Sequence, residues 1–229
     1  MLSCAVKAVL EHRVRVDVLV WDKHDRRHQV PGRDDVANLA RMYYRVLIHA
    51  ARQWGRPNWA VTADENTALD WEHIAGFVGR TRVVKLGPQL HLEMMHERRT
   101  FQASVKTVKS SDELLVRVAD LFAGMGRYLR EQASNYLAWH AWRAGTESRS
   151  LQLGLALPGL DDPSEPPLSS SAKARFELVH RLNELIASHR MPVSLETQGY
   201  FVTYRPSLPL NFWHYTPRHE LDRAPVKQR

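Results

Sequence analysis

Apolar and polar residues repeat along the chain in two spacings, and each spacing predicts one kind of secondary structure. Apolar residues three or four positions apart predict helices over residues 2–12, 34–54, 70–78, 112–142 and 172–189, of which the third begins at Thr67 or Asp70. Alternation at every second position, or a short apolar run, predicts strands over residues 14–20, 58–63, 81–86, 101–108 and 211–215, and a strand or hairpin over residues 193–204. Helices and strands that take turns along a chain are typical of a layered α/β fold.

Short polar residues mark where two of these helices should begin. Asp34 or Asp35 is suited to cap the second helix, because its side chain can accept the first free backbone N–H groups. Ser110 or Ser111 is suited in the same way to cap the fourth helix, and the acidic residues that follow would favour its first turn through the helix dipole. The fourth helix should contain a break, because glycines interrupt it.

A segment rich in proline and serine divides the chain. Between residues 160 and 171 three prolines are followed by three serines, a composition typical of an extended connection. We therefore expect a core domain over residues 1–157, a linker over residues 158–171, and a C-terminal extension over residues 172–229. This extension, made of a helix and strands, should pack on the core.

Composition narrows the class of protein. The formal net charge is +7, which favours phosphate-rich partners such as nucleic acid, although basic composition occurs in proteins of many kinds. Cys4 is the single cysteine, so an intrachain disulfide and zinc sites of the CxxC type are excluded. No apolar run approaches the roughly 20 residues that a membrane-spanning helix needs, and no signal peptide is evident. We expect a soluble, cytoplasmic protein with no membrane partner, in which self-association or a protein partner stays open.

Two acidic residues lie where they could share chemistry. Asp64 directly follows the predicted strand over residues 58–63, and Asp120 interrupts the apolar stripe of the fourth helix. A carboxylate among apolar neighbours is costly unless a cation pairs with it. Small residues beside Asp120 should let the helix approach a sheet closely; they are Ala119, Ala123 and Gly124. A carboxylate from a strand end and one from an adjacent helix can then share Mg²⁺ or Mn²⁺.

Neighbouring residues offer weaker candidates and plainer explanations. Glu65 is more typical of a solvated neighbour than of a ligand, and Asp22 ends another predicted strand. Lys109 and Ser111 could hold a phosphate at the start of the fourth helix, but an ordinary helix cap explains Ser111 as well. Asp64 could close a turn. Asp120 could instead pair with an arginine, for which Arg82 and Arg127 are candidates.

Two other sets of residues have spacings that indicate packing or a loop rather than a binding site. The aromatic residues Tyr136, Trp139 and Trp142 recur every three residues, which indicates packing on a helix face more than base stacking. His24 and His28 lie four apart in a segment predicted as a loop, where that spacing does not favour a metal site.

The segment Ser110-Ser111-Asp112-Glu113-Leu114-Leu115-Val116-Arg117-Val118-Ala119-Asp120-Leu121-Phe122-Ala123-Gly124, together with Asp64-Glu65-Asn66 after a strand, resembles a known family. That family is domain of unknown function 3800, whose later signature is a serine-containing loop and a helix with an Ala-Asp-Leu core. The resemblance spans most of the chain. The sequence departs at Arg117, where the family often has glutamine, and it lacks the usual first strand with its Asp-Glu-Ser-Gly motif.

The resemblance implies an α/β fold similar to ribonuclease H, a mixed sheet flanked by helices, here without its N-terminal strand and with a C-terminal helix and strand appendage. It implies that Asp64 and Asp120 bind Mg²⁺ or Mn²⁺ and serve catalysis, with Glu65 and Asp22 as weaker ligands. The implied activity is metal-dependent hydrolysis of nucleic-acid phosphodiesters. The alternative is an inactive family remnant that acts as a nucleic-acid or protein binding module.

Overall fold

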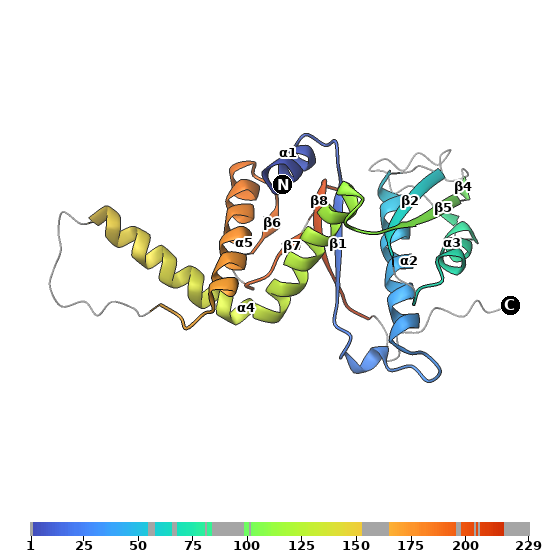
Figure 1. Cartoon of the computed structure of the whole chain (residues 1–229), viewed down its shortest axis with the longest axis horizontal. Helices are drawn as coiled ribbons and strands as arrows, with labels where there is room; N and C mark the ends of the chain where they lie inside the picture. The colour runs from blue at the N-terminus through green and yellow to red at the C-terminus, as the bar shows by residue number, and fades with distance from the viewer. Residues whose placement is uncertain are drawn as a thin grey trace, which may run out of the picture. The chain divides into compact units, whose positions relative to one another are not determined.

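Helices and strands alternate along the chain in the computed structural model, which confirms the predicted mixed α/β class (Figure 1). The structure describes residues 2–54, 58–65, 68–80, 82–83, 99–100, 102–152, 165–195, 198–203, 205 and 207–217. The helices are α1 (Leu2–Leu10), α2 (Asp35–Trp54), α3 (Trp71–Arg80), α4 (Leu114–Gln152) and α5 (Ser170–Ser188). The strands are β1 (Val16–Trp21), β2 (Asn58–Asp64), β3 (Arg82–Val83), β4 (Arg99–Thr100), β5 (Gln102–Val108), β6 (Val193–Ser194), β7 (Val202–Thr203) and β8 (Leu210–Tyr215).

The backbone forms two compact units. The helical unit comprises Met1–Arg15 and Phe122–Phe212, and the parallel-sheet unit comprises Val16–Leu121 and Trp213–Arg229. The chain passes from one unit to the other after Arg15, within α4 and within β8. These units do not follow the predicted boundaries at residues 157 and 171. The predicted division into a core, a linker and an extension therefore stays a prediction.

The parallel-sheet unit is built on β2 and β5, which pair in parallel from Asn58↔Gln102 to Asp64↔Val108. Helices α2 and α3 lie beside this pair (Figure 1). One face of the strands packs on the helices through side chains that include Trp59, Ala63, Ala103 and Val105. The alternate positions, which include Ala60, Thr62, Ser104 and Lys106, are exposed. Alternation along each strand thus gives the pair one covered face and one open face.

The remaining described strands also pair two by two. β3 and β4 are antiparallel, β6 and β7 form the hairpin expected within residues 193–204, and β1 lies beside β8. Within the described part of the chain these pairs do not join into one sheet, so the continuous mixed sheet of a ribonuclease-H-like fold stays a prediction. Asn66, the end of the predicted strand over residues 81–86, and most of the predicted linker lie outside the described residues.

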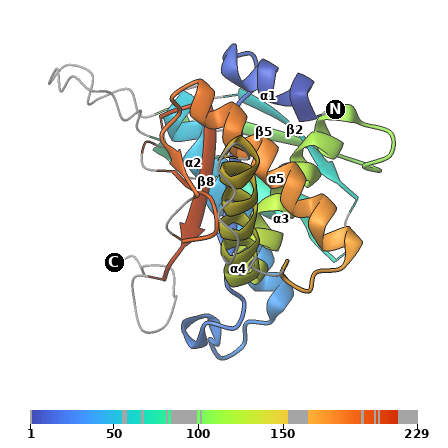
Figure 2. The same ribbon diagram turned by 90° about the vertical axis from the view of Figure 1, so that its left-hand side faces the viewer.

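The helical unit has an aromatic interior between α4 and α5, which lie side by side (Figure 2). The ring of Phe176 on α5 lies 5.4 Å from that of Tyr136 and 5.7 Å from that of Trp139. All three side chains are buried. The prediction that Tyr136 and Trp139 pack rather than stack on bases is therefore confirmed.

Side-chain caps were predicted at the starts of two helices, α2 and α4, and the structure confirms the cap of α2 alone. Asp34 caps α2 as predicted, because its Oδ1 accepts the Ala37 N–H at 2.8 Å. The prediction for α4 is wrong, since this helix begins at Leu114 and no acidic residue lies in its first turn. Ser110 instead uses its N–H in a contact with another segment. α4 contains a break, as predicted, but it lies at Gln132, whose backbone is not helical, and not at Gly124 or Gly126, which are helical.

No helix in the described ranges is long and apolar enough to cross a membrane.

Candidate functional site

Asp64 occupies the carboxyl end of the parallel strand pair. It is the last residue of β2, and the Glu65 N–H continues the pairing by donating to the Val108 oxygen at 2.8 Å. The Ser110 N–H donates to Asp64 Oδ1 at 3.1 Å and so fixes the carboxylate against the loop that follows β5. Ligands of open parallel sheets bind at this end of the strands. The position predicted from sequence for Asp64, at a strand end, is confirmed.

Asp120 lies on the exposed side of α4, which corrects the expectation of a carboxylate on a core-facing surface. Its small neighbours Ala119, Ala123 and Gly124 are exposed as well. A methyl group built at Gly124 would meet nothing within 4 Å, so this glycine does not serve a close approach. The apolar neighbours of Asp120 in sequence occupy other sides of the helix, because each residue turns the direction by about 100°.

Three acidic groups from three elements converge in the parallel-sheet unit. Partial burial raises the pKa of Asp120, and the negative charge of Asp64 raises it further. The pKa of Tyr43 on α2 is raised by burial, then by the charges of Asp64 and Asp120. The charge of Asp64 thus acts on the Asp120 carboxyl, which is distant in sequence, and the charges of both carboxylates act on the Tyr43 phenol.

Tyr43 is the site residue that sequence reasoning missed. Tyr43 belongs to the helical spacing that predicts a helix over residues 34–54, a spacing typical of core positions, but its side chain is 37% exposed. Its ring packs edge-on against Trp71 of α3, with centroids 4.9 Å apart, which holds the ring in place. The sequence carried no signal for this role, because helical spacing cannot tell a core residue from one at the rim of a site.

The weaker candidates have local roles in the structure. Glu65 is exposed. Asp22 Oδ1 accepts the His24 N–H at 2.9 Å and closes the turn after β1. Lys109 is exposed after β5, and the Ser111 hydroxyl donates to Asp112 Oδ1 at 2.8 Å. Ser111 thus has an intramolecular partner, and its expected place at a helix start is wrong, while binding roles for these residues stay predictions.

The carboxylate pair suits a divalent cation with few protein ligands. Among the described residues no group of three or more His, Cys, Asp or Glu is arranged to hold a metal ion. Mg²⁺ commonly uses one or two carboxylates and completes its shell with water and substrate phosphates. A cation would also relieve the repulsion that raises the pKa of Asp120. Of the alternative partners for Asp120, Arg127 instead pairs with Glu131 at 2.8 Å, and the Arg82 side chain lies outside the described part.

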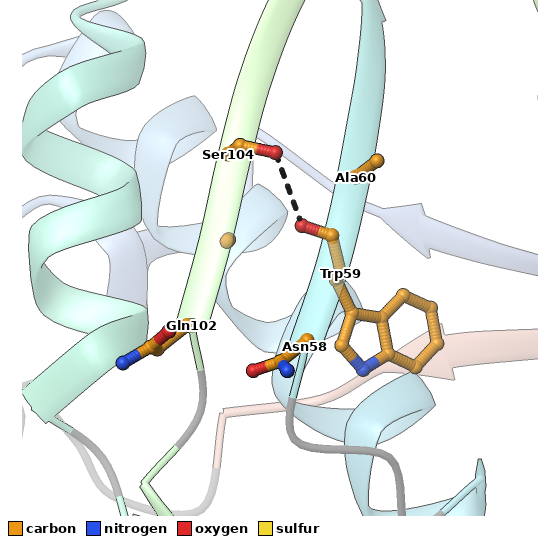
Figure 3. Close-up of a pocket in the computed structure, with 6 residues that line it drawn as sticks. Asn58, Trp59, Ala60, Gln102 and Ser104 are labelled. Atoms are coloured by element: carbon orange, nitrogen blue, oxygen red, sulfur yellow. Dashed lines mark hydrogen bonds between the residues drawn. The ribbon is translucent and has the colours of Figure 1, made fainter.

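A hollow of about 430 Å³ lies at the opposite end of the same two strands (Figure 3). It is lined by Asn58, Trp59, Ala60, Gln102, Ala103 and Ser104. The Ser104 hydroxyl donates to the Trp59 carbonyl oxygen across its floor at 3.5 Å. Since the strands begin here and Asp64 ends β2, this hollow does not belong to the carboxylate site.

Two archaeal proteins match the chain along nearly all of its length. The uncharacterised protein ORF2′ of Methanothermobacter thermautotrophicus is 33% identical over 217 residues, which cover 93% of this chain and 69% of that protein. The uncharacterised protein ORF2 of the same organism is 31% identical over 216 residues, covering 93% and 68%. No family model matches the chain, and no solved structure matches it.

Proposed function

The chain belongs to the family of the archaeal ORF2 and ORF2′ proteins, and from its site we propose that it is a divalent-metal-dependent hydrolase of nucleic-acid phosphodiesters. The observation that carries this proposal is the convergence of the Asp64 and Asp120 carboxylates at the end of a parallel strand pair. Like charges kept together at an exposed strand end have a cost, and a bound cation offsets that cost.

Each residue of the site has a separate proposed role, which follows from its position. Asp64 and Asp120 would hold Mg²⁺ or Mn²⁺, and the Ser110 N–H fixes the orientation of the Asp64 carboxylate. When bound, the cation supplies water activation and stabilisation of the leaving oxygen. Tyr43 presents a phenol that stays protonated at neutral pH, because burial and both carboxylates raise its pKa. That hydroxyl can donate a hydrogen bond to a phosphate oxygen.

Two further features support the proposal. The net charge of +7 favours a polyanionic substrate. The Ala119-Asp120-Leu121 segment and the strand-ending Asp64 resemble domain of unknown function 3800, which is similar to ribonuclease H. On the basis of this resemblance, we also propose that the chain is a member of that family and has a ribonuclease-H-like fold. Similarity of fold does not by itself establish an activity, so the proposed chemistry rests on the two carboxylates.

A non-catalytic binding module is the second candidate function. The observation that favours it is the lack of a third metal-ligating side chain among the described residues around the carboxylate pair. A protein of this kind would use its net positive charge to bind nucleic acid, or would bind a protein partner, without cleaving it.

Cleavage assays separate the two functions. The purified chain is incubated with single- and double-stranded DNA and RNA in Mn²⁺, Mg²⁺ or EDTA. We expect cleavage with metal only, and a loss of about a hundredfold or more in Asp64→Asn and in Asp120→Asn, the scale of losing one electrostatic catalytic group. Glu72→Gln, an exposed change of equal charge on α3, serves as the control. Cleavage that survives Asp120→Asn removes that residue from the mechanism, and binding without cleavage in any metal supports the binding module.

A further inference from the structure

The open face of β2 and β5 presents side chains that differ from those on the covered face. Its residues are exposed and lie opposite one another in register, as Asn58↔Gln102, Ala60↔Ser104 and Thr62↔Lys106. Their side chains carry amides, hydroxyls, an ammonium group and a methyl group. Parallel strands are usually covered by apolar layers on both faces. Because none of these side chains is large and apolar, the face suits water or a polar molecule better than a further apolar layer.

Small side chains leave room for the hollow of about 430 Å³ at the start of the two strands (Figure 3). Ala60 and Ser104 lie opposite each other there and fill little space. The exposed amides of Asn58 and Gln102 belong to the first residues of the two strands and are accessible to a ligand. A volume between about 300 and 1,000 Å³ is typical of small-molecule sites. The hollow therefore has the size and the accessible polar groups of a binding site.

The groups that line this hollow favour a neutral ligand with hydrogen-bonding edges. The lining residues carry no charge, so the hollow does not favour an ion. The side-chain amides of Asn58 and Gln102 each offer both donors and an acceptor. The edge of a nucleobase offers the same two kinds of group, and asparagine and glutamine pair with adenine in this way. A base turned out of a single strand thus matches the hollow.

The same face connects the hollow with the carboxylate site. Asn58 and Asp64 lie at the two ends of β2, about 20 Å apart at about 3.3 Å per residue. Lys106 lies between them on the neighbouring strand, opposite Thr62, and its exposed ammonium group suits a phosphate. A stacked nucleic-acid strand advances about 3.4 Å per nucleotide, so this length holds about six nucleotides. Polar groups therefore follow the face from the hollow to the acidic residues.

We propose that the open face of β2 and β5 binds a single strand of nucleic acid, with an unpaired base in the hollow and a phosphate at Lys106. This inference rests on the proposed function, because the same strand carries its scissile phosphate to Asp64 and Asp120. A duplex fits less well, because its bases stay stacked inside the helix and do not enter a hollow. A second copy of this chain also fits less well, since the centre of a protein interface is rich in aromatic and other apolar side chains.

Binding measured in EDTA tests this face without cleavage. Fluorescence anisotropy follows the full chain as it binds labelled oligodeoxyadenylate of about twelve nucleotides, an abasic strand of the same length, or the adenine–thymine duplex. We expect the adenine strand to bind at least about tenfold more tightly than the abasic strand, and more tightly than the duplex. Lys106→Ala should weaken binding about tenfold and reduce the log–log salt slope by about 0.7, the effect of one phosphate contact. Lys7→Ala makes the same charge change at an exposed position of the helical unit and should have no effect.

A second variant tests the hollow separately from charge. Gln102→Ala removes an amide and no charge, so it should weaken binding of the adenine strand about fivefold or more and leave the salt slope unchanged. The abasic strand should bind this variant as tightly as it binds the native chain, because no base enters the hollow. Circular dichroism checks that each variant folds, and Lys106→Ala decides the matter if Gln102→Ala does not.

Four binding results would each overturn the proposal. They are equal binding of the adenine and abasic strands, tighter binding of the duplex than of the single strand, no detectable binding, and full affinity in Lys106→Ala. Self-association of the native chain in sedimentation velocity that Lys106→Glu abolishes would instead assign the face to a second copy. Single-strand binding that persists in Asp120→Asn, with no cleavage by the native chain in any metal, would uphold the face and reject the nuclease. Metal-dependent cleavage at an unchanged rate in Lys106→Ala and in Gln102→Ala would reject the face and keep the nuclease.

Discussion

The helical unit and the parallel-sheet unit bury different kinds of side chain. Between α4 and α5 large aromatic rings are buried together with aliphatic side chains such as Val179 and Leu182, and Phe176 there is fully covered. Beside β2 and β5 the interior consists mostly of smaller apolar residues, which include Ala51, Ala63, Ile74 and Val78. In this second unit aromatic side chains such as Phe77 and Tyr43 remain exposed. The carboxylate site of Asp64 and Asp120 lies in this unit with the smaller side chains.

The two units also differ in how they treat charge. In the helical unit Arg143 pairs with Glu177, and Arg175 lies over the Tyr128 ring. In the parallel-sheet unit Asp64 and Asp120 repel each other at a strand end. Both units pair opposite charges, since Arg27 pairs with Asp25 in the parallel-sheet unit, but this unit also holds two carboxylates that act on each other where a ligand can use them.

Removing the central ring of the helical unit should have the largest effect on stability. Phe176→Ala leaves a cavity among Tyr136 and Trp139, and we expect the free energy of unfolding to fall by about 3–5 kcal/mol. Phe77→Ala in the parallel-sheet unit removes a ring that is 50% exposed and should cost less than about 1 kcal/mol. Urea unfolding followed by tryptophan fluorescence measures both. Equal losses would show that the aromatic interior is not the scaffold.

Two glycines with positive φ allow a sharper test of packing in each unit. Gly199 in the helical unit has φ of +70°, and a Cβ there would lie 2.5 Å from the Ala133 carbonyl oxygen. Gly32 in the parallel-sheet unit has φ of +76°, with nothing within 4 Å of its Cβ position. Gly199→Ala should therefore cost more than about 2 kcal/mol, since the clash adds to backbone strain.

Gly32→Ala carries the strain alone and should cost about 1 kcal/mol. Thermal unfolding of both variants gives the comparison, and a cost at Gly32 that matches the one at Gly199 would contradict it.

Local signals in the sequence predicted the elements well. The periodicity of α2 and α5 gave their lengths to within a few residues, and Asp34 marked the start of α2. The start of α4 was missed, since the helix begins at Leu114 and not after Ser110 or Ser111, and the contact of the Ser110 N–H with Asp64 is distant in sequence. Pairing of β2 with β5 is equally long-range, so the alternation of each strand could not reveal its partner.

The sequence predicted only part of the candidate site, because local patterns do not reveal contacts between residues that are distant in sequence. A strand end identified Asp64, but the neighbours of Asp120 in sequence suggested burial that the turn of the helix does not produce. The burial of His28 and Asn38 was not predicted, because neither residue belongs to a periodic apolar pattern. Buried polar residues of this kind become visible only when the loop and the helix are placed together.

The smallest expected effect tests the like charges directly. Since burial and Asp64 raise the pKa of Asp120, the ionised carboxylate is less favourable in the folded chain than in the unfolded chain. Stability is therefore lost as the pH rises through the raised pKa, and no penalty exists below about pH 3, where both states are protonated. In EDTA at pH 7, Asp120→Asn should stabilise the chain by less than about 1 kcal/mol, because exposed charges are screened.

In a chain of this length that gain is about 1–3 °C in melting temperature, and it should vanish near pH 3. Glu72→Gln makes the same charge change on α3 and should not show this gain. Differential scanning calorimetry at both pH values measures the difference. A variant less stable than the native chain at pH 7 would mean that the Asp120 carboxylate has a cationic partner in the folded chain, and the repulsion by Asp64 would then not be the dominant effect.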